Sequence, residues 1–320
     1  MPAARRPNLA PGSSELIRLR DRIRKYRRIA VKYAGRGATS VYRLLRRAGL
    51  EQPYQLVIRT YRPNPTQWPA ELRLSVAAIA DIHFGEPYLG LDRLQMIIDT
   101  TNATRPDLIV LLGDYGATHH HAIEHRQQMT TLARAASRLS APLGVFAVLG
   151  NHDWSADPAA LIRGAGPVVG EALVSAGIQV LENDAVRLEH HGRPFWLAGL
   201  GDQLARVRGG RGVDDLPGTI SKMTDDAPAI LLAHEPDVFP AVPSRFALTL
   251  AGHTHGGQIR VFGYPLYVPS RYGRRYVHGH VIEDDRHLVV AAGVGATDLP
   301  IRIGVPPEIA LVQLGGTARC

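Results

Sequence analysis

The sequence predicts an α/β protein whose core is a largely parallel β-sheet, and two observations predict it. The chain has 320 residues, of which 45% are hydrophobic and 21% charged, an ordinary composition for a globular protein with a large core. From residue 74 onward, short apolar runs alternate with segments of helical periodicity. Such runs are typical of strands that are buried on both faces of a parallel sheet.

The first 50 residues differ from the rest of the chain in charge. They carry 14 Lys and Arg against 2 Asp and Glu, a net +12, whereas residues 51–320 carry 23 against 27, a net −4. Apolar residues recur at spacings of three and four from Leu16 to Tyr33, which predicts a helix with a basic face. We therefore expect residues 1–70 to form a basic amphipathic helical extension with a linker, and residues 71–320 to form the main domain.

Residues 14–50, which we call the arm, have three interpretations. The arm packs on the main domain with its basic face in solvent, or it lies on an anionic membrane surface. Nucleic-acid binding is disfavoured because the arm has few aromatic residues to stack on bases. The chain has no apolar run long enough for a transmembrane helix, and its single cysteine, Cys320, excludes an intramolecular disulfide.

Strands and helices alternate in the first half of the main domain. Before it, residues 52–71 contain four prolines and are expected to be a linker or a lead-in poor in strands. The elements then predicted, in chain order, are a strand at 74–80, a helix at 91–103, a strand at 108–112, a helix at 122–139, a strand at 145–149 and a helix at 158–176.

The second half is richer in strands. Residues 185–190 and 195–199 are expected to form a hairpin around Gly192. Further strands are expected at 229–233, 247–251, 288–292 and 308–313.

Polar side chains follow five of the predicted strands. In an α/β sheet the carboxyl ends of the strands converge on one edge, where ligands bind. Imidazole with carboxylate and amide oxygen, and no thiolate, suits Mn, Fe, Zn or Mg. Seven donors are too many for one ion, whereas two ions that share one carboxylate would use them all and would favour hydrolysis of a phosphoester. The seven candidate ligands are Asp81, His83, Asp114, Asn151, His234, His253 and His255.

These residues occur in five ordered motifs that resemble those of the calcineurin-like metallophosphoesterases. The motifs are Asp81-Ile-His83, Gly113-Asp114, Gly150-Asn151-His152-Asp153, His234 and Gly252-His253-Thr254-His255. The longer stretches 252–258 and 299–308 are similar to the bacterial branch that contains YkuE, YaeI and UDP-2,3-diacylglucosamine hydrolase-type enzymes. The resemblance covers about residues 72–315 and leaves out the N-terminal 70.

The resemblance implies a fold and a set of metal ligands. The fold would be two facing mixed β-sheets flanked by helices, a four-layer αββα sandwich, with residues 71–320 as the catalytic domain. Two divalent ions are implied, with Mn first and Fe, Zn or Mg as alternatives. Asp114 would bridge them, with one oxygen on each. His253 and His255 would reach different ions from strand-like backbone. Asp81, His83 and His255 would hold the first ion, and Asn151, His234 and His253 the second.

The resemblance also implies a role for His152, which would stabilise the transition state or protonate the leaving oxygen. Many family members orient this histidine with an Asp three residues after the bridging Asp, but that position is Ala117 here. Either another carboxylate such as Asp153 then orients His152, or His152 is less firmly held. Arg271, Arg274 and Arg275 either form a solvated basic loop or pair with a substrate phosphate.

Our leading hypothesis is a dinuclear metal-dependent phosphohydrolase. It would cleave a phosphodiester or pyrophosphate bond of a membrane-associated lipid precursor or phospholipid. One alternative is a soluble nucleotide or nucleic-acid phosphodiesterase. The other is a non-catalytic interaction module, and the complete set of seven ligands disfavours that module. A nucleic-acid groove should be basic, and residues 51–320 are not. We expect a cytoplasmic location, peripheral on the inner face of the plasma membrane if the arm binds lipid.

Overall fold

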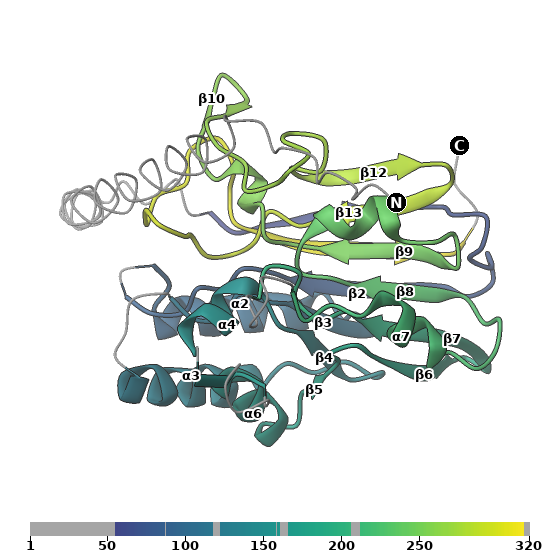
Figure 1. Ribbon diagram of the computed structural model, residues 1–320, viewed down its shortest axis with the longest axis horizontal. Helices are drawn as coiled ribbons and strands as arrows, with labels where there is room; N and C mark the ends of the chain where they lie inside the picture. Colours follow the sequence, from purple (N-terminus) through teal and green to yellow (C-terminus); the bar gives the residue numbers. More distant parts are fainter. Residues whose placement is uncertain are drawn as a thin grey trace, which may run out of the picture.

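Two six-stranded mixed sheets face each other in the computed structural model (Figure 1), which describes residues 55–86, 88–117, 122–157, 159–160, 166–205 and 212–316. The first sheet contains, in spatial order, β1 (Val57–Tyr61), β14 (Glu308–Leu314), β2 (Leu74–Ile79), β3 (Leu108–Leu112), β4 (Val145–Val148) and β5 (Gln179–Val180). The second contains β12 (Gly279–Glu283), β13 (Arg286–Val290), β9 (Phe246–Ala251), β8 (Ala229–Leu232), β7 (Arg193–Gly199) and β6 (Asp184–His190).

Each sheet has a parallel centre. Strands β2 to β5 run parallel to one another, and so do β7, β8, β9 and β13. Antiparallel pairs lie toward the sheet edges, at β14–β2, β12–β13 and β6–β7. The parallel centre matters for function because it brings the carboxyl ends of β2, β3 and β4 to one edge of the first sheet.

The described residues form three hydrophobic cores. Two of them arise because successive side chains of the first sheet point to opposite faces of that sheet. In β3, Leu108, Val110 and Leu112 point into the core between the sheets, whereas Ile109 and Leu111 point into the core under the helices. Helices α2 (Leu91–Ala103), α3 (Ala122–Ala136) and α6 (Val168–Ser175) cover that outer face. This alternation follows from the period of two of a β-strand.

The outer face of the second sheet has a thinner helical layer. It consists of α7 (Leu216–Ser221) and the 3-10 helix η2 (Pro236–Ala241), whose Phe239 packs on the third core. The four layers of the predicted αββα sandwich are therefore present, and the expectation of two facing mixed sheets is confirmed. No helix among the described residues is both long and apolar enough to span a bilayer.

The prediction that residues 52–71 are a linker or a lead-in poor in strands is wrong. Strand β1 lies within them and pairs in parallel with β14 at the edge of the first sheet. The Tyr61 hydroxyl donates a hydrogen bond of 2.8 Å to the buried carboxylate of Glu308, which fixes the strand. The main domain thus begins at or before Val57 rather than at residue 71, and the arm lies outside the described residues.

The predicted helix at 158–176 also differs from the structure. Helix α4 (Asn151–Ala156) begins directly after β4, and α6 begins only at Val168. Pro167 at the N-cap of α6 explains its start, because proline cannot continue a preceding helix but suits a first turn. The early start of α4 places Asn151 and His152 on the edge where the parallel strands end.

Candidate metal centre

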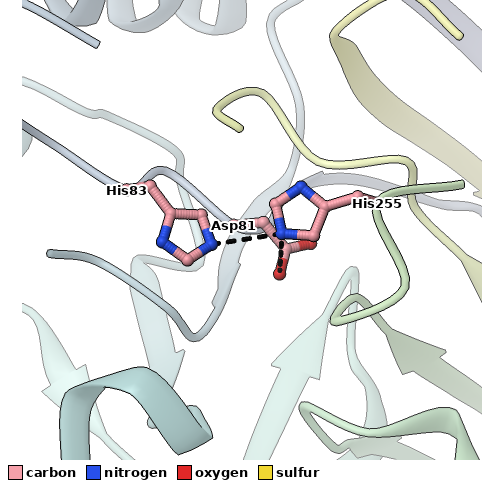
Figure 2. Close-up of side chains that lie close together, drawn as sticks. All are labelled: Asp81, His83 and His255. Carbon is pink, nitrogen blue, oxygen red and sulfur yellow. Dashed lines mark hydrogen bonds and ion pairs between the residues drawn. The ribbon is translucent and has the colours of Figure 1, made fainter. Parts of the chain in front are cut away.

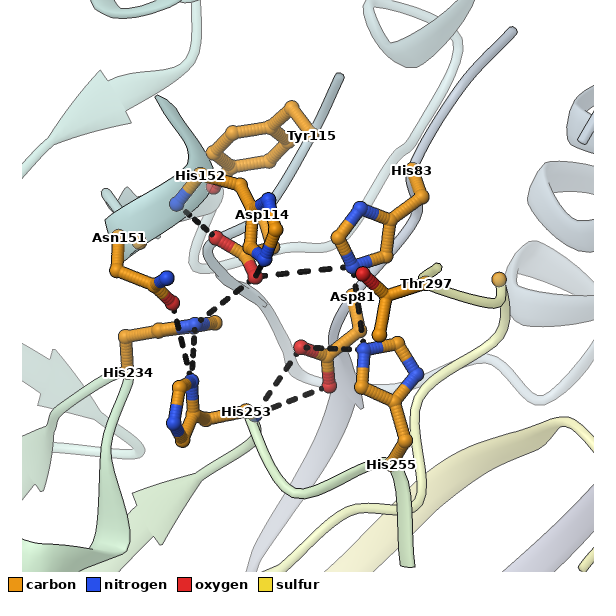
Figure 3. A network of polar contacts seen from close by, with 12 residues as sticks. Asp81, His83, Asp114, Tyr115, Asn151, His152, His234, His253, His255 and Thr297 are labelled. Carbon is orange, nitrogen blue, oxygen red and sulfur yellow. Dashed lines mark hydrogen bonds and ion pairs between the residues drawn. The ribbon is translucent and has the colours of Figure 1, made fainter. Parts of the chain in front are cut away.

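The structure brings all seven candidate ligands together at one edge of the two sheets (Figure 3). Asp81, Asp114, His234 and His253 each lie two residues beyond the end of their strand, β2, β3, β8 and β9 respectively. All seven side chains are buried except that of Asn151, which is half-buried.

The first half of the centre consists of Asp81, His83 and His255 (Figure 2). The Nε2 atoms of the two histidines lie 3.1 Å apart. The Nε2 atom of His255 lies 3.6 Å from Asp81 Oδ1. Two imidazole nitrogens and a carboxylate oxygen that face one point form a donor set suited to a divalent cation.

The second half consists of His234, His253, Asn151 and Asp114. The Nδ1 atom of His253 lies 3.0 Å from Asn151 Oδ1 and 3.3 Å from His234 Nε2. The opposite nitrogens of both rings contact main-chain carbonyls, His234 Nδ1 that of Leu112 at 2.6 Å and His253 Nε2 that of Pro269 at 2.9 Å. An N–H donated to a main-chain carbonyl fixes the orientation of the ring and aims the opposite nitrogen into the cluster, as in metal-binding histidines.

Asp114 connects the two halves through one oxygen. Its Oδ2 lies 3.3 Å from His234 Nε2 and 3.6 Å from His83 Nε2. Its Oδ1 accepts a hydrogen bond of 2.8 Å from the main-chain N–H of His152. The expectation that each Asp114 oxygen takes a different ion therefore differs from the structure, in which Oδ2 alone faces both halves.

Five of the seven residues have a left-handed backbone, with φ between 45° and 68°: Asp81, His83, Asp114, His253 and His255. Such values are uncommon for residues other than glycine and are concentrated at functional sites. They also correct the expected strand-like backbone at His253 and His255. Asp81 stabilises this conformation, because it accepts the His253 N–H at 3.0 Å on one oxygen and 3.1 Å on the other.

Burial keeps three histidines of the cluster neutral. It lowers the pKa of His83 and of His253 to about 3, and the pKa of His255 well below its usual value. A histidine binds a metal only through an unprotonated nitrogen. These three rings are therefore in the protonation state that a metal ligand needs at neutral pH.

His234 and Asp114 form a buried ion pair. Burial alone would lower the pKa of His234, but the Asp114 carboxylate raises it well above its usual value. Burial opposes ionisation of Asp114, yet the charges of His234 and His152 hold its pKa well below the usual range. Burial raises the pKa of Asp81 to about 7. Divalent cations would compensate the buried negative charges of Asp114 and Asp81. The donor set therefore fits the two metals that the sequence implies.

Asp153 does not occupy the place beside His152 that is expected from the sequence. Asp153 is buried and accepts the main-chain N–H groups of Gly150, Asp114 and Tyr115 at 2.8, 3.0 and 2.9 Å. Its oxygens are thus occupied by the loops that carry the ligands, and it does not orient His152. The Nδ1 atom of His152 is buried without a hydrogen-bond partner among the described residues. Asp153 is therefore a positioning residue for the loops after β3 and β4.

His152 contacts the cluster through its other nitrogen. The Nε2 atom lies 4.0 Å from Asp114 Oδ2, and the ring packs edge-on against His83 with centroids 5.0 Å apart. The side chain of His152 is 23% exposed, whereas that of Asp114 is 1% exposed. His152 therefore lies at the solvent side of the centre, where a substrate would approach.

The sequence reasoning missed Arg302, which is fully buried behind the first half. Its guanidinium donates to the carbonyls of Ala292 at 2.7 Å and Gly295 at 2.6 Å, and lies 3.2 Å from His255 Nδ1. Its charge favours the ionised form of Asp81. The residue lies within the motif 299–308, where an arginine flanked by two isoleucines was a signal of a buried cation.

The three arginines proposed for phosphate binding lie outside the cluster. Arg271 pairs with Asp237 at 3.6 Å and Arg275 with Glu283 at 2.7 Å, while the Arg274 guanidinium lies over the Tyr264 ring. Two of the three are thus already paired with carboxylates. No contact between any of them and the cluster is found among the described residues.

The chain is similar in sequence to a known protein family and to two bacterial relatives. A family model for calcineurin-like phosphoesterases matches residues 74–281. The chain is 33% identical over 245 residues to the uncharacterized metallophosphoesterase YkuE of Bacillus subtilis, covering 76% of this chain and 79% of YkuE. It is 31% identical over 239 residues to the phosphodiesterase YaeI of Escherichia coli, covering 74% and 80%. A solved dimetal phosphatase from Danio rerio aligns over 71% of this chain and 88% of its own, with 13% identity and a TM-score of 0.42.

Proposed function

The chain belongs to the calcineurin-like phosphoesterase family and is a metal-dependent phosphoester hydrolase, and we propose that it cleaves a phosphodiester or pyrophosphate bond in a membrane-associated lipid precursor or phospholipid. One observation carries the catalytic part: the seven donors form a single buried cluster whose halves share Asp114 Oδ2. Two ions in such a pair act as Lewis acids and lower the pKa of a bound water.

We infer that the two halves hold separate ions, Mn²⁺ first among the candidates. Asp114 would be the shared ligand. The ring orientations support this assignment, because His234 and His253 each aim one nitrogen at the cluster while the other nitrogen contacts a main-chain carbonyl. The other ligands would be Asp81, His83 and His255 for the first ion and Asn151 for the second.

His152 would act on the leaving group. It lies at the solvent side of the centre, and its Nε2 is the atom that faces the shared oxygen of Asp114. An imidazolium placed there can donate its proton to the leaving oxygen, which would otherwise depart as a costly anion. Asp153 would contribute only indirectly, by fixing the loops that carry Asp114 and His152.

The lipid part of the proposal is supported by the charge distribution. A net +12 in residues 1–50 against −4 in residues 51–320 favours attraction of the N-terminal segment to an anionic surface. The same asymmetry disfavours nucleic acid as the substrate, since the catalytic domain lacks a basic excess. A soluble nucleotide phosphodiester fits the metal cluster equally well and is the second candidate.

A substrate panel tests the proposed function. Purified, Mn-loaded protein is assayed on bis-p-nitrophenyl phosphate, UDP-diacylglucosamine in mixed vesicles, a cyclic nucleotide and single-stranded DNA. We expect the highest kcat/KM on the lipid-linked substrate. A higher kcat/KM on the cyclic nucleotide would replace the lipid proposal with the soluble one, and inactivity on every ester would refute the hydrolase assignment.

Removal of the arm is expected to weaken binding to anionic vesicles while leaving the catalytic domain active. A chain that begins at Tyr54 keeps β1, so the first sheet stays complete. Each Lys or Arg near an anionic surface contributes about 1 kcal/mol, so loss of even a few should lower the vesicle partition coefficient by ~10²-fold. Co-sedimentation with neutral and anionic vesicles measures the loss, and turnover of bis-p-nitrophenyl phosphate is the control. Unchanged lipid binding by the truncated chain would mean that the arm does not bind the membrane. A full chain that ignores anionic vesicles, or a truncated chain that unfolds, would mean that the arm is a structural part of the domain.

A further inference from the structure

A second surface outside the catalytic cluster exposes large apolar side chains. It consists of the hairpin formed by β10 (Arg260–Val261) and β11 (Tyr264–Pro265) and of the loop that follows it, which we call the hairpin surface, residues 260–276. Of the thirteen large apolar side chains that are exposed among the described residues, six lie here: Val261, Phe262, Tyr264, Leu266, Tyr267 and Tyr272. Such clustering, in contrast to scattered single residues, marks an interaction site.

The turn of the hairpin has an unusual residue at its tip. Phe262 and Gly263 connect the two strands with φ values of 50° and 83°. Two-residue turns with both φ values positive favour Asn-Gly or Asp-Gly, and a bulky residue in this conformation is an outlier. Phe262 is nevertheless 97% exposed, so burial within the chain does not offset its strain. Phe262 departs from the sequence preference of this turn and gains no burial within the chain, which indicates that its side chain contacts a partner.

The charge of this surface favours an anionic partner. Residues 259–277 contain four arginines and no Asp or Glu. Arg271 and Arg275 pair with Asp237 and Glu283 of neighbouring elements, so the positive excess of this surface comes from Arg260 and Arg274. The Arg274 guanidinium lies 5.2 Å from the centroid of the Tyr264 ring, and that of Arg271 lies 5.6 Å from the Tyr272 ring. Aromatic side chains beside basic ones are typical of residues at the interface of a bilayer, where the rings enter the headgroup layer and the cations remain among phosphates.

The hairpin is attached directly to the metal-binding loop. Pro265 of β11 packs on Gly257, two residues after His255. The Leu266 N–H donates to the Ile259 carbonyl at 3.0 Å, and the Pro269 carbonyl lies 2.9 Å from His253 Nε2. Figure 1 shows β10 projecting beyond the ends of the sheets. The base of the hairpin and the loop after it therefore adjoin the metal centre.

We propose that the hairpin surface docks on an anionic phospholipid bilayer, with Phe262 and Leu266 inserted at the boundary between headgroups and acyl chains, so that the metal centre opens at headgroup level. This deepens the proposed function, on which the choice of a lipid partner rests. The two side chains proposed to insert, Phe262 and Leu266, provide too little apolar area for a stable protein interface, which commonly buries more than about 1,000 Å². Insertion of one aromatic and one aliphatic side chain suits a bilayer surface.

Fluorescence of Phe262→Trp in the full chain tests the insertion. The three native tryptophans, Trp68, Trp154 and Trp196, are buried, so the introduced indole reports on the tip. The matched control is Ile282→Trp on β12, at a position that is 58% exposed and outside the hairpin surface. With phosphatidylcholine–phosphatidylglycerol vesicles, Phe262→Trp should shift to shorter wavelength and be quenched by brominated acyl chains, whereas Ile282→Trp should show neither change.

A second variant separates insertion from attraction by the arm. Phe262→Ser combined with Leu266→Ser should lower the vesicle partition coefficient at high salt by ~10²-fold or more, because two large apolar side chains are no longer transferred from water into the bilayer. Turnover of bis-p-nitrophenyl phosphate should stay unchanged. Absence of quenching at position 262, or equal vesicle binding by the double variant, would overturn the proposal even if UDP-diacylglucosamine is hydrolysed. Quenching without lipid hydrolysis would refute only the lipid substrate.

Discussion

Asp114→Asn is expected to lower kcat on bis-p-nitrophenyl phosphate by ~10³-fold or more. Asp114 Oδ2 is the one atom that faces both halves of the cluster, 3.3 Å from His234 Nε2 and 3.6 Å from His83 Nε2. An amide in its place removes the negative charge and presents either a neutral oxygen or an N–H group to the cations. The loss of a shared ligand should cost several kcal/mol of transition-state stabilisation, and each 1.4 kcal/mol is about tenfold in rate.

Asp99→Asn is the matched control for this change. Asp99 is an exposed residue of α2, paired with Arg138 on the surface at 2.7 Å, and surface pairs contribute little. Its variant should keep full turnover and metal content. If Asp114→Asn retained more than a tenth of the activity, Asp114 would not be the ligand that joins the two halves.

His152→Ala is expected to reduce turnover by ~10²–10⁴-fold while the protein keeps both metals. The reduction should be smaller for p-nitrophenolate, a good leaving group that needs little protonation, than for an alkyl ester. His152 also lies within reach of the cluster, with Nε2 4.0 Å from Asp114 Oδ2, so the metal content distinguishes an acid from a ligand. Elemental analysis beside kinetics on both esters is therefore the measurement.

The control for His152→Ala is His191→Ala, because His191 is exposed in the turn between β6 and β7. Its variant should be indistinguishable from the parent chain. Loss of one metal equivalent from His152→Ala would make His152 a ligand. Equal losses for good and poor leaving groups would exclude its role as the acid.

The cluster could be predicted from the sequence because its residues directly follow buried strands. Asp81, Asp114 and His234 each come two residues after a strand whose apolar run is evident in the sequence. Parallel strands carry such residues to one edge whatever the details of their loops. The confirmed family and the two facing sheets follow from the same pattern of apolar runs and polar ends.

Features that depend on contacts distant in the sequence could not be predicted. Strand β1 is paired with β14, some 250 residues away, and its own segment is rich in proline. The hydrogen bonds of Asp153 to three main-chain N–H groups, and those of Arg302 to main-chain carbonyls, depend on how the loops meet. The left-handed backbone at His253 and His255 likewise follows from loop closure on Asp81, which no local pattern encodes.

Metal content tests the central claim, two cations held by the seven donors, most directly. The full chain is stripped with a chelator, reconstituted with Mn²⁺, freed of excess metal and analysed for metal per protein, with activity followed at each addition. The account predicts a plateau at two equivalents, with full turnover only as the second is filled. A plateau at one equivalent with full activity would contradict it.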